Sequence, residues 1–326
     1  MRSGERPVPA PAPVSPPCGR LAPSPTGAQH VGNARTYLIA WLAARSRRGR
    51  VVLRIEDIDS PRVKLGAADE ACADLRWLGL DWDDGPIFQT QRLSLYQDAL
   101  AKLQAQELVY PCTCTRTDVE RAASAPHAEN EGPVYPGTCA GRRVADAAAL
   151  GDRPFAWRFR SGAGSAVWDD LVRGPTRLDL RQLGGDFVVW KSAGTPAYQL
   201  AVVVDDAAQQ ISEVVRGDDL IPSTPRQLLL YAALGLTPPG FGHVPLVVGP
   251  DGRRLAKRHG DTRLSTLRSH GVKAEALLGL LAWSCGWSQR IEPVTARALL
   301  RRFRWDTIPP EPFVLRPELL ASITDA

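Results

Sequence analysis

The sequence has few of the features that mark membrane or secreted proteins. No apolar run reaches the roughly 20 residues that a helix needs to span a bilayer, so no membrane partner is expected. The first 17 residues contain six prolines but lack the continuous apolar stretch of a signal peptide. We therefore expect a cytoplasmic protein, in which thiols stay reduced. Its six cysteines are then better interpreted as metal ligands or core residues than as disulfides.

The net charge of the sequence is also small. Lys plus Arg number 40 and Asp plus Glu number 35, a net charge of +5, which permits an anionic partner such as phosphate or RNA but does not by itself indicate one. Hydrophobic residues make up 44% of the 326 residues, enough for a sizeable core divided between two or three packed units. The proline-rich residues 1–17 predict a disordered tail without chemistry.

The segment that follows the tail has the pattern of a βαβ unit. Residues 18–24 predict a short buried strand and a turn, residues 32–45 carry apolar side chains at helical spacing, and residues 50–55 are rich in strand formers. A strand, a turn, a helix and a second strand imply a parallel sheet. We therefore predict an α/β fold of the Rossmann type, with ligands bound at the carboxyl ends of its strands.

The remainder of the chain predicts further helices and strands around an insertion. Ser223 or Thr224 is a plausible cap for one of these helices, with Pro225 in its first turn. A Gly- and Arg-rich loop follows the last strand. The expected elements are helices over 66–80, 91–108 and 224–235, strands over 198–204, 211–216 and 246–248, a loop over 249–260, and a helical region over 263–326.

Two segments have the composition of a nucleotide site. Residues 22–33 connect the first strand to the first helix, and a helix N-terminus offers free N–H groups and a positive dipole end to a triphosphate. Gly27 and Gly32 allow close approach to the backbone, and His30 can donate to a phosphate oxygen. Residues 254–258 form a basic loop that could close over the charge of a pyrophosphate leaving group. Either segment alone is weak evidence.

Taken in this order, the two segments resemble the HIGH and KMSKS signatures of class I aminoacyl-tRNA synthetases. Residues 20–27, 54–59 and 214–220 are similar to the glutamyl-specific branch, and the resemblance runs from about residue 19 to 270. The second His of HIGH is replaced by Asn33. In the KMSKS-like loop Arg254 and Ala256 replace the first Lys and the Ser, which leaves Lys257 to carry the loop's main role.

Glutamate requires three charged contacts. Its two carboxylates call for arginine and its ammonium for a carboxylate, and Arg20, Arg216 and Glu56 supply these types at the ends of predicted strands. Which arginine takes the side-chain carboxylate stays open. The resemblance implies a glutamate site of Arg20, Ala22, Ser24, Glu56, Tyr198 and Arg216, ATP binding by His30, Gly32, Asn33 and Lys257, and catalysis by His30 and Lys257.

Three cysteines predict a metal site in the insertion. Cys112 and Cys114 form a CxC pair, and Cys139 returns after a Gly- and Pro-rich stretch. Zinc takes about four ligands and favours thiolates, and on spacing alone His127 is a candidate for the fourth. The resemblance instead implies Tyr135, because shortened glutamyl synthetase relatives carry Cys-x-Cys, Tyr and Cys. One structural Zn²⁺ is expected, and Mg²⁺ is expected with ATP, although no ligand for Mg²⁺ can be assigned.

The short C-terminal part indicates which member of this branch the chain resembles. Some 55 residues follow the helical stretch that begins near residue 270, too few for an anticodon-reading domain. The chain, including residues 218–227, resembles the glutamyl-queuosine tRNA(Asp) synthetases. This implies activation of glutamate with ATP and transfer to queuosine in tRNA(Asp), and it implies no protein partner. A truncated glutamyl-tRNA synthetase that charges a tRNA 3′ end and a catalytically silent RNA-binding paralogue remain alternatives.

These considerations predict five segments. They are a tail (1–17), the first half of the catalytic domain (18–109), an insertion with the zinc site (110–196), the second half with the KMSKS-like loop (197–262), and a helical region similar to a stem-contact domain (263–326).

Overall fold

The computed structural model describes residues 16–58, 62–122, 134–255 and 261–324. Two sheets form the centre of the molecule. The first has the order β1-β2-β3 with all strands parallel. In the second, of order β7-β6-β10-β9, β6, β10 and β9 run parallel and β7 is an antiparallel edge. The strands are β1 (Cys18–Leu21), β2 (Arg50–Ile55), β3 (Asp84–Phe88), β6 (Ser165–Asp170), β7 (Gly174–Asp179), β9 (Glu213–Gly217) and β10 (Gly240–Val244).

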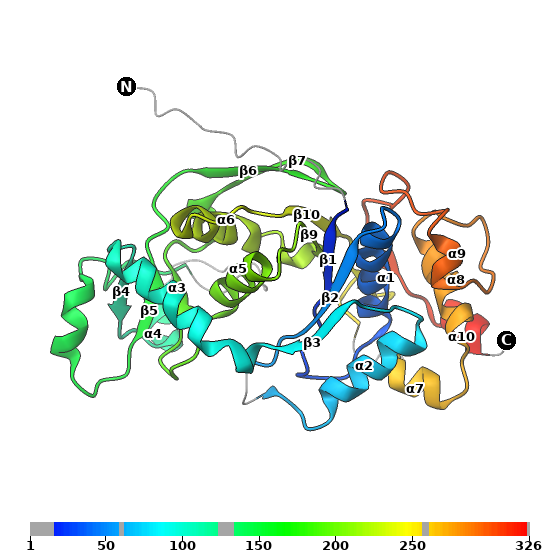
Figure 1. Ribbon diagram of the computed structural model, residues 1–326, viewed down its shortest axis with the longest axis horizontal. Helices are drawn as coiled ribbons and strands as arrows, with labels where there is room; N and C mark the ends of the chain where they lie inside the picture. The colour runs from blue at the N-terminus through cyan, green and yellow to red at the C-terminus, as the bar shows by residue number, and fades with distance from the viewer. Residues whose placement is uncertain (1–15, 59–61, 123–133, 256–260, 325–326) are drawn as a thin grey trace.

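The two sheets meet at β1 and β9. The backbone of Ser212 donates to the carbonyl of Cys18 at 2.9 Å, and the Arg20 side chain reaches the carbonyl of Val215 at 2.8 Å. Figure 1 shows β1 and β9 close together at the centre of the molecule. The chain therefore places β2 and β3 on one side of β1, and β9 and β10 on its other side. This doubly wound arrangement confirms the predicted Rossmann-like α/β fold, and ligands bind at such a switch point.

Helices and two separate hydrophobic cores flank this layer. The first core contains the buried face of α1 and the C-terminal helices, and the second contains α3, α5 and α6. Cys18, Cys72 and Cys285 are buried in these cores, as predicted. The helices are α1 (Val31–Arg45), α2 (Ala67–Trp77), α3 (Leu93–Ala105), α5 (Tyr198–Ala208), α6 (Ser223–Leu234), α7 (Leu264–Ser269), α8 (Ala274–Ser284), α9 (Ala296–Leu299) and α10 (Pro317–Thr324), with 3-10 helices η2 (Gln89–Arg92) and η5 (Asp218–Leu220).

The segment after β3 and α3 builds a small antiparallel sheet of its own. Strand β5 lies between β4 and β8. Figure 1 places this sheet at one end of the molecule, beyond α3. The β6–β7 hairpin leaves it and joins the large sheet at β10. Its remaining elements are β4 (Val109–Cys112), α4 (Arg116–Ala122), η3 (Val144–Leu150), β5 (Ala156–Phe159), η4 (Leu180–Leu183) and β8 (Phe187–Trp190).

Three local predictions were wrong. Residues 198–204 belong to helix α5 and not to a strand, because burial between α3, α6 and the sheet outweighs the strand preference of three consecutive valines. Helix α6 begins at Ser223, and neither Ser223 nor Thr224 caps it, because their hydroxyls bond Gln199 and Arg216 instead. The C-terminal region also adds β12 (Phe313–Val314), which pairs with β11 (Val247–Val248).

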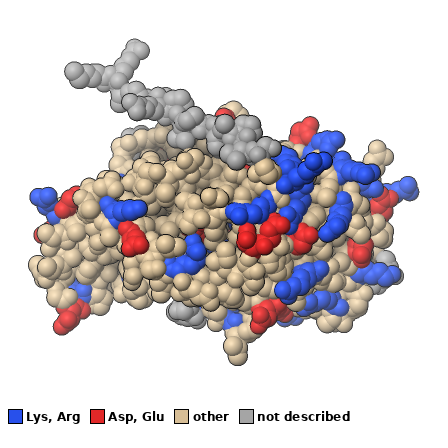
Figure 2. Space-filling model, viewed as in Figure 1, with Lys and Arg blue, Asp and Glu red and all other residues tan. Residues whose placement is uncertain are grey.

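The visible surface carries charges of both signs. Figure 2 shows Lys and Arg interspersed with Asp and Glu, mostly over the side where Figure 1 places α1, α2 and α9. Arg45, for example, forms ion pairs with Asp81 and Asp83. On this face, therefore, the small positive net charge does not form a uniformly basic patch. Among the described residues, no helix is long and apolar enough to cross a membrane.

Candidate functional site

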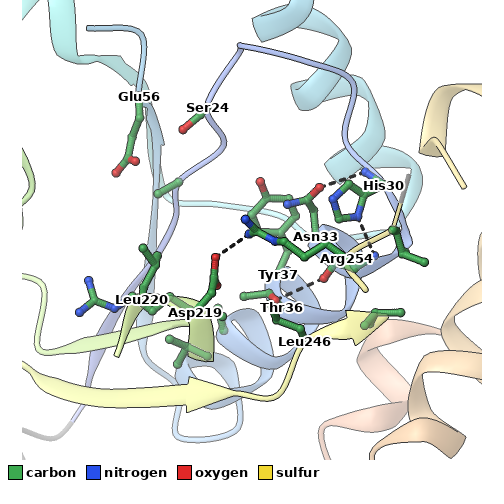
Figure 3. A pocket seen from close by; sticks show the side chains of 18 of the residues that line it. Ser24, His30, Asn33, Thr36, Tyr37, Glu56, Asp219, Leu220, Leu246 and Arg254 are labelled. Carbon is green, nitrogen blue, oxygen red and sulfur yellow. Dashed lines mark hydrogen bonds and ion pairs between the residues drawn. The ribbon is translucent and has the colours of Figure 1, made fainter. Parts of the chain in front are cut away.

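A cavity of about 640 Å³ opens where β1 and β9 meet. All of the predicted substrate residues in the described part of the chain line it. Glu56 and Ser24 lie at one end, and His30, Asn33 and Arg254 at the other (Figure 3). The predicted residues in the lining are Arg20, Ala22, Ser24, His30, Gly32, Asn33, Glu56, Tyr198 and Arg216. The cavity therefore has an end that suits an amino acid and an end next to a helix start.

Glu56 follows β2 and is held by a buried arginine. Arg54 is completely buried, and its Nη2 donates to Glu56 Oε1 at 3.1 Å. Burial raises the pKa of the Glu56 carboxyl, against the influence of Arg54 and Arg20, which favour its ionised form. A second cation near Glu56, such as a substrate ammonium, would therefore find a carboxylate that is oriented but only partly neutralised.

Two aspartates on α5 neutralise the arginines below the cavity. Asp206 accepts from Arg54 Nη1 at 2.8 Å and lies 3.7 Å from Nε of Arg20. Asp205 accepts from Arg92 Nε at 2.6 Å and from Tyr96 at 2.8 Å. Both aspartates are buried, so this network fixes β1, β2, α3 and α5 relative to one another.

Arg20 keeps part of its guanidinium unused. Its Nη1 donates to the carbonyl of Val215 at 2.8 Å, whereas its buried Nε makes no hydrogen bond within the described part of the chain. Burial lowers the pKa of Arg20, and Arg54 adds to this effect while Asp206 opposes it. Arginine nevertheless stays protonated in proteins, so Arg20 presents a buried cation to the cavity.

Arg216 lies opposite on β9 and is only 4% exposed. Its Nη1 and Nη2 donate to Gln227 Oε1 and Thr224 Oγ1, both at 2.8 Å, and its Nε donates to His243 Nε2 at 3.0 Å. These acceptors are uncharged, and among the described residues no carboxylate lies within ion-pair distance of Arg216. The arrangement orients the guanidinium and leaves its charge available for a carboxylate ligand.

Tyr198 is the first residue of α5 and lies in the lining of the cavity. A tyrosine in this apolar run could have been a core residue, but 37% of Tyr198 is exposed and it lines the cavity. Ser24 is likewise exposed in the turn after β1. Both hydroxyls can therefore reach a ligand in the cavity.

His30 caps the helix that begins at the other end of the cavity. Its Nδ1 accepts from the backbone of Gly32 at 3.1 Å, and its own backbone N–H donates to Asn33 Oδ1 at 3.1 Å. Burial and the nearby Arg254 lower the pKa of His30, which favours a neutral ring with its proton on Nε2. A Cβ at Gly32 would lie 2.9 Å from the His30 ring, so a larger residue there would push the ring away from its capping position.

The first residues of the basic loop lie over the same end. Arg254 pairs with Asp219 at 2.5 Å across the lining (Figure 3). Beyond the loop, Val31 donates to the carbonyl of Thr262 and Leu264 to the carbonyl of Gln29, at 2.9 and 2.8 Å. The helix start and the end of the loop are thus tied together. Lys257, predicted as the principal loop cation, lies outside the described residues, as does Ala256.

The three predicted cysteines of the insertion converge on one point. The sulfur atoms of Cys112, Cys114 and Cys139 all lie within 4.8 Å of one another. The Tyr135 hydroxyl is 3.4 Å from Cys112 Sγ and accepts from the backbone of Cys139 at 2.8 Å. Tetrahedral zinc with Zn–S bonds of about 2.3 Å separates its sulfurs by roughly 3.8 Å. The 3.7 Å between the sulfurs of Cys114 and Cys139 matches this spacing.

The surroundings of the cluster favour an anion at Cys139, whereas burial and the neighbouring thiols raise the pKa of Cys114 to about 11 and burial raises the pKa of Tyr135. Arg158 stacks on the Tyr135 ring at 3.9 Å and its Nε donates to Cys112 Sγ at 3.3 Å. Burial raises the pKa of the Cys139 thiol, but hydrogen bonds from Thr113, Tyr135 and Cys114 outweigh it and lower that pKa to about 7. The donor set therefore fits zinc. His127, the other candidate for the fourth ligand, lies outside the described residues.

Sequence reasoning missed the residues that support the site. Arg54 lies in the segment 54–59 that resembles the glutamyl branch, but the resemblance gives it no role, and no sequence pattern points to His243. One signal was available for Asp205 and Asp206, since Tyr198, Asp205, Asp206 and Gln209 recur at helical spacing. Interpreting that run as a strand concealed it.

Comparisons with known proteins agree with this geometry. The family described as tRNA synthetases class I (E and Q), catalytic domain, matches residues 18–307. The chain is 50% identical to the Glutamyl-Q tRNA(Asp) synthetase of Rhodopirellula baltica over 91% of this chain and 95% of that protein. It is 41% identical to the glutamate–tRNA ligase of Geobacter sulfurreducens, over 92% of this chain and 64% of that protein.

A solved structure shows the same fold. The glutamate–tRNA synthetase of Elizabethkingia anophelis superimposes with a TM-score of 0.80 at 24% identity, over 94% of this chain and 69% of that one. The doubly wound sheet, the convergent cavity and these matches lead to one conclusion: the chain belongs to the class I aminoacyl-tRNA synthetases of the glutamyl and glutaminyl type, and within them to the glutamyl-Q tRNA(Asp) synthetase family.

Proposed function

We propose that this enzyme activates glutamate with ATP and transfers the glutamyl group to queuosine in the anticodon of tRNA(Asp). The observation that carries the proposal is the cavity itself, which brings Arg20, Arg216 and Glu56 to one end and a helix start to the other. The name of the Rhodopirellula baltica relative, a Glutamyl-Q tRNA(Asp) synthetase, supports the acceptor, because the similarity to it covers nearly the whole of both chains.

Glutamate matches the charges at its end of the cavity. Its carboxylates would face the cations Arg20 and Arg216, and its ammonium would face Glu56. Tyr198 and Ser24 would add hydroxyls, and Ala22 leaves room beside them. Glutamine, which lacks the second carboxylate, would leave one buried guanidinium unneutralised, a large penalty in a buried site.

Activation joins one glutamate oxygen to the α-phosphorus of ATP and breaks the bond to pyrophosphate. The N-terminus of α1 and the Nε2–H of His30 would stabilise the negative charge on the phosphate, and Lys257 would stabilise the departing pyrophosphate. Gly32 and Asn33 shape the turn that presents these donors. Mg²⁺ would supply further charge neutralisation for the triphosphate.

Transfer then forms an ester between the glutamyl carboxyl carbon and a hydroxyl of the queuosine cyclopentene ring. AMP leaves, and the hydroxyl proton leaves with it or passes to solvent. No protein base is assigned to this step. The orientation of the acylated carbon by Arg20, Arg216 and Glu56 is then the main contribution of the protein.

For the insertion we propose one structural zinc ion held by Cys112, Cys114, Tyr135 and Cys139. The convergence of three thiols and a phenol within the described residues supports it. Such a set would fill all four positions with protein ligands, so the ion would hold the insertion in shape and would not activate water. The positive neighbours Arg158 and Arg142 would offset the charge of the ligands.

The remaining sequence predictions stay part of this proposal. The five segments predicted above would divide catalysis from tRNA contact, and the insertion, residues 110–196, would lie over the catalytic cleft. A tRNA substrate implies a cytoplasmic enzyme.

Two assays test the proposal. Glutamate-dependent exchange of labelled pyrophosphate into ATP, run without tRNA, should proceed, and glutamine should not support it. Labelled glutamate should then pass to tRNA(Asp) that carries queuosine but not to the same tRNA with guanosine in that position. A requirement for tRNA in the exchange step, or transfer to a tRNA 3′ end, would favour a glutamyl-tRNA synthetase instead. Background exchange alone would favour a silent RNA-binding protein.

A further inference from the structure

Three buried arginines approach the cavity, and they differ in their partners. Arg54 is bonded to the carboxylates Glu56 and Asp206. Arg20 lies near Asp206. Within the part of the chain that the structure describes, the acceptors of Arg216 are the uncharged side chains of Gln227, Thr224 and His243. Something other than an ion pair must therefore hold the Arg216 side chain in place before a substrate arrives.

The His243 ring is bonded on both of its nitrogen atoms. It is completely buried on β10, and its Nδ1 lies 2.5 Å from Asp170 Oδ2. Its Nε2 lies 3.0 Å from Nε of Arg216 and 3.1 Å from Oγ1 of Thr224. Arginine can only donate, so Nε2 must accept, and the ring proton must be on Nδ1.

Asp170 is itself fixed at the end of β6. One of its oxygens accepts from the backbone N–H groups of Val172 at 3.0 Å and His243 at 3.1 Å. Burial disfavours ionisation, but the bonds from His243 and from these N–H groups outweigh it and lower the pKa of Asp170 to about 2. A carboxylate at this position accepts from Nδ1–H and so selects the tautomer that Arg216 requires.

Thr224 contacts both Arg216 and His243. Its hydroxyl accepts from Nη2 of Arg216 and can donate its own proton to Nε2 of His243. Phe241 lies beneath the guanidinium at 5.2 Å and packs flat against the His243 ring at 6.2 Å between centroids. Three of the five N–H groups of Arg216 are thereby occupied, and two remain for a ligand.

We propose that His243, oriented by Asp170, is a positioning residue that presents Arg216 to a carboxylate of glutamate and so sets the affinity for the amino acid. The inference rests on the proposed function. The chain from Asp170 through His243 to Arg216 orients the cation with uncharged contacts, so that its positive charge is not cancelled before the substrate binds. His243 does not touch the substrate.

Two variants with side chains of similar size distinguish the role of the His243 Nδ1 atom from that of its Nε2 atom. In His243→Asn the amide can still donate to Asp170 but offers no acceptor to Arg216. In His243→Gln the amide oxygen can occupy the place of Nε2. In the pyrophosphate exchange assay, His243→Asn should raise the KM for glutamate by about tenfold to a hundredfold, the range for a lost hydrogen bond to a charged group. The KM for ATP should not change, and His243→Gln should recover most of the loss.

A double-mutant cycle with Arg216→Lys tests whether His243 acts on glutamate binding through Arg216. In that background His243→Asn should have little further effect on the KM for glutamate, because lysine does not use the same acceptor. Equal effects of the Asn and Gln variants, an unchanged KM in His243→Asn, or additive effects with Arg216→Lys would each overturn the proposal. A merely structural histidine would lower the melting temperature and the active fraction of both variants without this pattern.

Two further measurements cover the cases in which His243→Asn does not fold or the unaltered protein shows no exchange. If His243→Asn does not fold, Asp170→Asn favours the ring tautomer that cannot accept from Arg216, and an unchanged KM for glutamate in that variant overturns the proposal equally. If the unaltered protein shows no exchange, the proposed function fails separately. Calorimetric binding of glutamate to the same variants then takes the place of the KM.

Discussion

At the scale of single residues, the site depends on how each buried charge is balanced. Glu56 has Arg54 as its direct partner, and Arg54 has additional carboxylates in Asp205 and Asp206. Removing the charge of Glu56 therefore leaves Arg54 neutralised. The change should act on substrate binding more than on folding, which makes Glu56 suitable for a direct test.

We expect Glu56→Gln to fold and to lose glutamate activation. The ammonium of glutamate would lose its ionic partner in a buried site, which costs about 2–4 kcal/mol, or about thirtyfold to several hundredfold in kcat/KM of pyrophosphate exchange. Asp57→Asn is the matched control, because this neighbouring carboxylate bonds Thr90 and does not line the cavity. If Glu56→Gln and the control have the same exchange kinetics, Glu56 is not part of the site.

At the scale of elements, the part of the insertion around the three cysteines is a small unit with its own core, whereas β5 and β8 pack in the second large core. Tyr110, Val119 and Tyr135 pack with the cysteines in a cluster separate from the two large cores. So few apolar side chains stabilise a fold weakly, and a metal ion would contribute much of the stability of this unit.

We expect one zinc ion per chain by elemental analysis of metal-replete protein. Removing it with a chelator should increase hydrogen exchange in the described residues 109–122 and 134–142, weaken transfer to tRNA and leave adenylate formation largely intact. Tyr135→Phe should weaken zinc retention, because it removes the only oxygen ligand of the proposed set. Cys72→Ala, a buried cysteine in a different core, should retain the metal fully. Metal-replete protein without zinc would refute the assignment.

A second prediction at this scale concerns the contact between α2 and α7. Asp74 on α2 is almost completely buried and pairs with Arg268 of α7 at 3.4 Å. Burial raises its pKa to about 6, an effect that Arg268 opposes. Between pH 4 and 6 the folded protein keeps a proton that the unfolded chain has lost, so this group makes stability fall as pH rises through that window.

Asp74→Asn should therefore stabilise the protein above pH 6, by about 2–3 kcal/mol in the free energy of unfolding. The gain should shrink as pH falls and vanish below about pH 3, where Asp74 is protonated in both the folded and the unfolded state. Urea unfolding of the two proteins at several pH values measures it. A gain that is independent of pH would indicate that folding does not shift the pKa of Asp74 and that the effect comes from packing.

At the scale of the whole molecule, the cavity lies between the two large cores. Arg20 of β1 and Arg216 of β9 are contributed by strands of the two sheets that meet there. A ligand that bridges these strands would connect both halves of the fold. Its binding energy should then add to the stability of the domain as a whole.

A stable analogue of glutamyl-adenylate should raise the melting temperature in calorimetry. At 100 times its Kd it would add about 2.7 kcal/mol, several degrees for a domain of this size. The glutaminyl analogue at equal concentration should give a much smaller shift. Equal shifts would show that the carboxylate end of the cavity does not discriminate, which would contradict the assignment of Arg20 and Arg216.

The sequence by itself determined the fold class and the local chemistry. The βαβ pattern of residues 18–55 follows from alternation and helical spacing within short stretches, and the turn around Gly32 needs no distant partner. The motifs also named residues of the cavity lining, and the spacing of the cysteines indicated a metal. Each of these features depends on neighbours in the chain, which a sequence displays directly.

Only the tertiary structure decided which charges neutralise one another and which remain for a substrate. Residues 198–208 are helical because α3, α6 and the sheet surround them, and this places Asp205 and Asp206 under Arg54 and Arg20. The bonds of His243 to Asp170 and Arg216 span 73 and 27 residues. Electrostatic balance in a buried site depends on distances in space, and no local pattern records those distances.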